Sequence, residues 1–87
     1  MAHTYLVECY WPGVDAGAVK AALARADAEE EDVQCIDTIL VPEDEIVLCL
    51  FTGPSAQAVH AATLRSGLPS ERVTPSIHLH APERGEP

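Results

Sequence analysis

Two histidines near the end of the chain have the spacing of metal ligands on a β-strand. The stretch SIHLH (residues 76–80) places His78 and His80 two positions apart, alternating with Ile77 and Leu79. Successive side chains of a strand point to opposite faces, so both imidazoles would lie on one face. Two imidazoles and a carboxylate suit Ni²⁺, Zn²⁺, Cu²⁺ or non-haem iron. The alternative is that the pair is the polar side of an edge strand.

Glu8 and His60 are the other candidate metal ligands. Glu8 is the one charged residue of the N-terminal stretch TYLVECYW. If this stretch pairs with the strand that carries the histidines, Glu8 would lie across from one of the imidazoles. His60 lies in an alanine-rich segment. It would be either a solvent-facing helix residue or, with a carboxylate or thiol beside it, a ligand or general base.

The three cysteines, Cys9, Cys35 and Cys49, match no zinc-binding spacing. Their odd number and the lack of a secretion signal indicate reduced thiols in a cytoplasmic protein. Cys9 and Cys49 lie in apolar stretches, where cysteine usually packs as a small hydrophobic residue. The sequence contains no Ser-His-Asp order, phosphate-binding loop, dinucleotide-binding glycine motif or HExxH motif. These features favour a binding protein over an enzyme.

The charge balance argues against two classes of partner. Fourteen acidic residues stand against five Lys and Arg, a net charge of −9. The basic residues are scattered, whereas phosphate recognition needs them clustered, so we expect no nucleic acid and no membrane as partner. The longest apolar run, residues 46–51, is too short to cross a bilayer. A chain of 87 residues has room for one domain. We place this domain at residues 1–80, followed by a flexible tail at residues 81–87.

Six elements are predicted to position these residues. Strands are expected at residues 4–11, 33–41, 45–52 and 72–80, with Pro75 marking the last as an edge strand. One helix is expected from Asp15 to about Glu31, and a second between a Ser55 N-cap and a Gly67 C-cap. The order βαββαβ is typical of a ferredoxin-like α+β sandwich, in which two helices cover one face of a four-stranded antiparallel sheet.

The side-chain pattern of the strands predicts an apolar helix-free face. In the first strand this face is expected to hold Leu6, Glu8 and Tyr10, because a charge avoids the core. In the last strand the residues expected to face the helices are Val73, Ile77 and Leu79. The near-continuous apolar run at 46–51 predicts burial on both faces of the third strand. Because the helix-free face is too apolar to remain in water, we expect a homodimer packed through it.

Three stretches give the chain a family resemblance. "YLVECYWPGV", "TILVPEDEIVLCLFTGPS" and "RSGLPSERV" resemble a family of small bacterial nickel-binding-protein-like chains, catalogued as a domain of unknown function, over Tyr5 to Leu79. The resemblance implies a ferredoxin-like fold, a dimer and bound Ni²⁺. In the nickel-binding branch, histidines lie near the start of the chain and around the second helix and the following turn. Here those positions hold Thr63 and Leu68, and His60 lies in that helix.

Two further functions fit the same residues. One is a dimer of the α/β-barrel kind that binds or converts a small organic molecule, with a pocket around Glu8, Tyr10 and Trp11. The other is an interaction module without a ligand.

Overall fold

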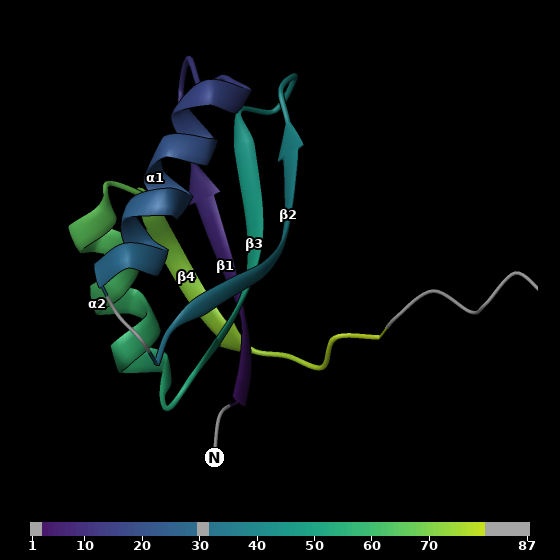
Figure 1. Ribbon diagram of the computed structural model, residues 1–87. Helices are drawn as coiled ribbons and strands as arrows, with labels where there is room; N and C mark the ends of the chain where they lie inside the picture. The colour runs from purple at the N-terminus through teal and green to yellow at the C-terminus, as the bar shows by residue number, and fades with distance from the viewer. Residues whose placement is uncertain (1–2, 30–31, 80–87) are drawn as a thin grey trace, which may run out of the picture.

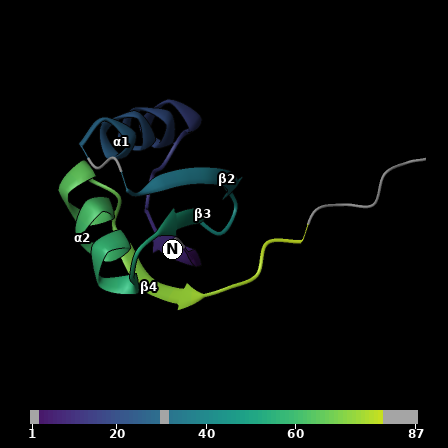
Figure 2. The same cartoon turned by 60° about the horizontal axis from the view of Figure 1, so that its bottom comes forward.

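The computed structural model describes residues 3–29 and 32–79, which form one antiparallel sheet covered by two helices (Figure 1). The elements in chain order are β1 (His3–Tyr10), α1 (Ala16–Glu29), β2 (Gln34–Val41), β3 (Ile46–Gly53), α2 (Ala56–Ser66) and β4 (Ser70–Pro75). The strand order in the sheet is β2-β3-β1-β4. Both helices lie on the same face of the sheet (Figure 2). The predicted ferredoxin-like α+β fold is confirmed.

Both helices begin at the predicted N-caps. The Asp15 carboxylate accepts a hydrogen bond from the Ala18 amide at 2.8 Å, and the Ser55 hydroxyl accepts one from the Ala58 amide at 3.1 Å. Each cap satisfies an amide that has no partner within the first turn of its helix. Within the described part of the chain, neither helix is long and apolar enough to cross a membrane.

The end of α2 is fixed by a left-handed glycine and by an arginine from α1. Gly67 has a φ of 94°, and the Leu68 amide donates to the Thr63 carbonyl at 2.9 Å. This is a Schellman cap, and the buried side chain of Leu68 provides its hydrophobic contact. Arg25 Nε donates to the Ser66 carbonyl at 2.7 Å. The two helices are therefore tied together where α2 ends.

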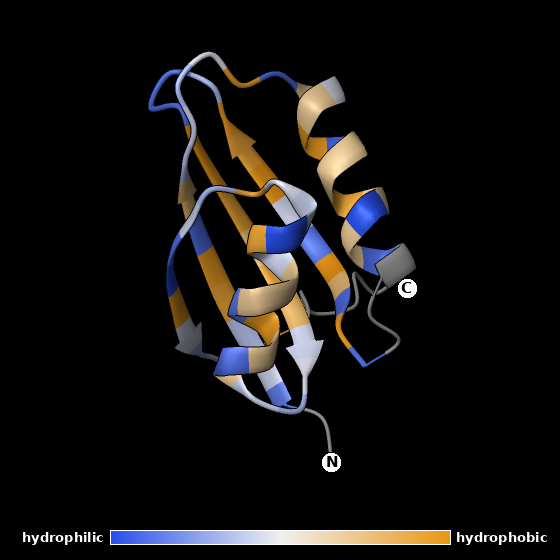
Figure 3. Ribbon diagram, turned by 90° about the vertical axis from the view of Figure 1, so that its left-hand side faces the viewer, coloured by the Kyte–Doolittle hydropathy of each residue, from blue (hydrophilic) through white to orange (hydrophobic). Residues whose placement is uncertain are grey.

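The core lies between the helices and the sheet, and the strands behind the helices are largely hydrophobic (Figure 3). Alternate residues of β3 are fully buried, namely Val47, Cys49 and Phe51. Their neighbours on the helix-free face are half-buried in the single chain: Ile46, Leu48 and Leu50. β3 is an inner strand of the sheet. The burial predicted on both of its faces is present on the helix-covered face, whereas the other face is not fully covered within one copy.

β4 differs from its prediction because it ends at Pro75 instead of continuing to residue 80. Tyr5 pairs with Pro75, and the Ser76 amide still donates to the Thr4 carbonyl at 2.9 Å. The same register would place Ile77 opposite His3, but β4 ends at Pro75 before it reaches that pair. Ile77 is therefore not in the core but 84% exposed.

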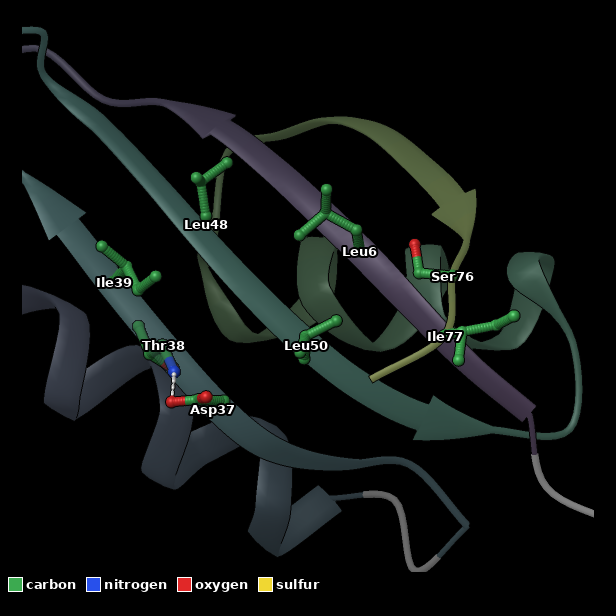
Figure 4. Close-up of a pocket in the computed structure, with 8 residues that line it drawn as sticks. All are labelled: Leu6, Asp37, Thr38, Ile39, Leu48, Leu50, Ser76 and Ile77. Atoms are coloured by element: carbon green, nitrogen blue, oxygen red, sulfur yellow. Dashed lines mark hydrogen bonds between the residues drawn. The ribbon is translucent and has the colours of Figure 1, made fainter. Parts of the chain in front are cut away.

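Residues 76–79 instead leave the edge of the sheet and run across its helix-free face (Figure 4). Leu79, which was also expected to face the helices, is 81% exposed. His80 and the expected tail, residues 81–87, lie outside the described residues.

Candidate functional site

An apolar groove runs along the helix-free face of the sheet (Figure 4). Its volume is about 330 Å³. The residues that line it come from β1, β2, β3 and the segment after β4: Leu6, Asp37, Thr38, Ile39, Leu48, Leu50, Ser76 and Ile77. Leu6 and Leu50 are a cross-strand pair, as are Ile39 and Leu48, so alternation along each strand places them on one surface. The predicted apolar face is therefore present as a groove.

His78 lies beside Asp37, one of the residues that line the groove. Its Nε2 is 3.6 Å from a carboxylate oxygen of Asp37, although β2 and β4 are opposite edges of the sheet. The contact exists because residues 76–79 cross the helix-free face instead of extending β4. The imidazole is shielded, with 23% of its side chain exposed. A carboxylate beside an imidazole nitrogen is the arrangement that fixes the orientation of a ligating histidine.

Among the described residues, Glu8 lies beside an arginine and not beside a histidine. The register places it opposite Arg72, and the two side chains form an ion pair at 3.7 Å. Both side chains are largely exposed, so the pair adds little to stability. The expected contact of Glu8 with the His78 imidazole is wrong because it assumed that the chain near residue 78 pairs with β1. His80 lies outside the described residues.

His60 belongs to a different environment on the helix side. Its Nδ1 lies 3.2 Å from the Ser70 hydroxyl, which lies 2.9 Å from the Thr63 hydroxyl. This chain of polar groups joins α2 to the start of β4. Among residues 3–29 and 32–79, no group of three or more His, Cys, Asp and Glu side chains is positioned to hold a metal ion. Glu8, His60 and His78 are therefore at three separate places.

The pocket expected around Glu8, Tyr10 and Trp11 is present only in part. A hollow of about 270 Å³ is lined by Glu8, Cys9, Tyr10, Ile46 and Glu71. Trp11 is not part of it and packs against the core instead. The hollow thus has two carboxylates and no enclosed apolar chamber of the kind that a small organic ligand requires.

A pair of thiols is a feature that the sequence analysis missed. Cys35 of β2 is half-buried and Cys49 of β3 is fully buried. The Cys35 sulfur lies 3.1 Å from the hydroxyl of Thr38, the residue that pairs with Cys49, so the two cysteines lie near each other on adjacent strands. The turn before Glu45 was the available signal, because a hairpin there brings residues 38 and 49 opposite each other. The irregularity that brings Cys35 close as well has no sequence signature that we recognise.

The two thiols differ in acidity. The hydrogen bond from Cys49, together with smaller contributions from Thr38 and the Asp37 backbone, lowers the pKa of Cys35 to about 7 against the opposing effect of burial. The same hydrogen bond, together with burial, raises the pKa of Cys49. Burial, and then the nearby Glu71, raise the pKa of Cys9 to about 11. Cys35 is therefore the most acidic of the three thiols.

Comparisons with known proteins agree with this geometry at the level of the fold. A family model described as nickel responsive protein SCO4226-like matches residues 5–75. The crystal structure of SCO4226 from Streptomyces coelicolor A3(2) superimposes with a TM-score of 0.69 and 24% sequence identity, covering 90% of this chain and 99% of that one. At that identity the likeness establishes the shared fold. No curated protein sequence matches the chain.

Proposed function

Because the chain belongs to the SCO4226-like family of nickel-responsive proteins, we propose that it binds Ni²⁺ as a homodimer. The observation that carries this proposal is the placement of His78 against Asp37 across the helix-free face. His80 follows two residues later and supplies a second imidazole. Ni²⁺ is commonly held by nitrogen and oxygen ligands, and imidazole is the side chain that suits it best here.

The described residues of one copy do not by themselves complete such a site, since no three potential ligands converge. A second copy would supply the missing ligands. Packing the helix-free faces about a two-fold axis covers the apolar groove and brings two 76–79 segments into one interface. His78 and His80 from both copies would then offer imidazoles to one ion, with Asp37 orienting His78. Glu8 and His60 remain outside this set.

The dimer has its own support in the exposed side chains of the groove. Ile39 is 57% exposed and Ile77 is 84% exposed, and both line a surface that also holds Leu6, Leu48 and Leu50. Contiguous apolar surface of this kind marks an interaction site in proteins. A location in the cytoplasm goes with the proposal, because an odd number of cysteines suits a reducing compartment.

Calorimetric titration with Ni²⁺ at neutral pH, using protein without an affinity tag, tests the metal site. We expect the parent protein to bind, and His78→Ala and His80→Ala each to weaken binding by about tenfold or more. Affinity should also fall in acid, because imidazole ligates metal only in its neutral form. Native mass spectrometry of the loaded protein should show the ion on the dimer.

The matched control is His60→Gln, which removes an imidazole but keeps a side chain able to hydrogen-bond to Ser70. It should bind Ni²⁺ as the parent does. The proposed site is wrong if the two C-terminal histidine variants bind as tightly as the parent, or if His60→Gln alone abolishes binding.

A further inference from the structure

The irregular part of β2 carries a cysteine that the proposed nickel site does not use. The pairing of β2 with β3 shifts between Cys35 and Asp37, so that Cys35 pairs with Phe51 and Thr38 pairs with Cys49. In a regular strand, residues three apart point to opposite faces. The extra residue of a β-bulge reverses this, and Cys35 and Thr38 both point to the helix-covered face. The bulge thereby brings a second cysteine to Cys49.

Contacts around the bulge hold the Cys35 thiol in place. Its sulfur lies 3.1 Å from the Thr38 hydroxyl and 3.4 Å from the Asp37 carbonyl. Thr38 pairs with Cys49 across the two strands, so the contact with the Thr38 hydroxyl places the Cys35 sulfur beside the Cys49 side chain. The two sulfur atoms are therefore neighbours on adjacent strands, with one thiol half-buried and the other fully buried.

The geometry assigns Cys35 and Cys49 as an oxidisable dithiol, which a hydroperoxide converts to a disulfide and a dithiol reductant restores. Cys35 is the residue that meets the oxidant, because it is the accessible member of the pair and lies on an edge strand. Cys49 is the resolving residue. Both cysteines lie on the helix-covered side of the sheet. A dimer that packs through the helix-free face would therefore not block access to Cys35.

The reaction proceeds in two balanced steps. The Cys35 thiolate attacks one oxygen of the hydroperoxide, so an S–O bond forms and the O–O bond breaks, and the departing oxygen takes a proton from solvent. The Cys49 thiol then attacks the sulfur of the resulting sulfenic acid. An S–S bond forms, and the hydroxyl group leaves as water with the proton of Cys49. The two sulfurs together lose two electrons, which the hydroperoxide gains.

Cys9 provides an internal comparison for this reaction. It is buried in β1, where it pairs with Val47, and its exposed fraction is 1%. It is not among the hydrogen-bond partners of Cys35. Three cysteines allow three pairings, and the folded protein should select only the one between Cys35 and Cys49.

The test uses the full chain, reduced and then treated with hydrogen peroxide in the presence of a chelator. Free thiols, counted after denaturation, should fall from three to one. Peptide mapping should find the Cys35–Cys49 link, and dithiothreitol should reverse it. Cys9→Ser should behave like the parent. In Cys49→Ala the sulfenic acid on Cys35 should persist and be trapped by dimedone.

Two results would overturn the assignment. One is a disulfide that involves Cys9 or joins two copies of Cys35. The other is oxidation of Cys35 to sulfinic acid in the parent while Cys49 stays reduced. If Cys49→Ala fails to fold, the parent and Cys9→Ser still decide between the three pairings. Because metal is chelated throughout, the outcome is independent of nickel binding.

Discussion

The thiol of Cys35 owes its acidity mainly to one neighbouring thiol. Its pKa of about 7 is set first by the hydrogen bond from Cys49, and only the thiolate reacts with an alkylating agent. We therefore predict that alkylation of Cys35 by iodoacetamide rises with pH, with a midpoint at about 7. In Cys49→Ala the donor is lost, so the midpoint should move up toward that of an ordinary thiol, about 8.5. Mass spectrometry of the modified peptide gives the rate at each pH.

Cys9→Ala is the control for this prediction. It removes another buried thiol, which does not contribute to the acidity of Cys35, so the midpoint should not change. An unchanged midpoint in Cys49→Ala would mean that the thiol–thiol hydrogen bond does not set the acidity.

Individual side chains were predictable where their environment depends on near neighbours in sequence. The outward placement of Glu8 and Tyr10 followed from alternation within one strand, and the Asp15 and Ser55 caps followed from their own residue types. The partner of Glu8 was not predictable in this way. It depends on the register between β1 and β4, which places Arg72 opposite it.

At the scale of elements, the left-handed glycine at the C-cap of α2 should not tolerate a side chain, and a helical glycine in α1 provides the control. Gly67→Ala forces a side chain into a left-handed conformation and places its Cβ 3.1 Å from the Arg25 guanidinium. We expect it to lower the free energy of unfolding by about 1 kcal/mol or more. Gly17→Ala, in the first turn of α1, should instead raise this free energy by a few tenths to about 1 kcal/mol. Urea denaturation measures both.

The pair is well matched because both variants restrict the unfolded chain to the same extent. A difference in sign must therefore come from the folded state. Equal effects of the two substitutions would show that the left-handed conformation of Gly67 costs an alanine nothing.

The existence and order of the elements were predictable, whereas the end of the last strand was not. Alternation in SIHLH fits a strand as well as it fits an extended segment without partners. β4 ends at Pro75, and the chain then turns toward Asp37 of β2, a residue far away in sequence. The bulge in β2 is similarly a property of strand pairing, so the approach of Cys35 to Cys49 could not be derived from residue types.

For the whole molecule, the apolar groove predicts a dimer that a single charge should break. Leu50→Asp places a carboxylate within the groove, where burial against a second copy would cost about several kcal/mol. The variant should sediment as a folded monomer, and the parent as a dimer. Leu64→Asp is the matched control, because Leu64 is 52% exposed on α2, away from the groove.

A dimer that persists in Leu50→Asp, or that is lost only in Leu64→Asp, would place the interface on the helix side. A parent that sediments as a monomer would remove the second copy on which the proposed nickel site depends. Ultracentrifugation over a range of concentrations separates these results.

The strand order also determines which strand pairs can form first during synthesis. β1 is made first, yet its partners are β3 and β4, which end at Gly53 and Pro75. During synthesis β1 therefore waits for more than half of the chain before it has any neighbour in the sheet. The hairpin of β2 and β3 closes earlier, because only a short turn separates its strands. The β2–β3 hairpin and α1 can therefore form before β1 takes its place between β3 and β4.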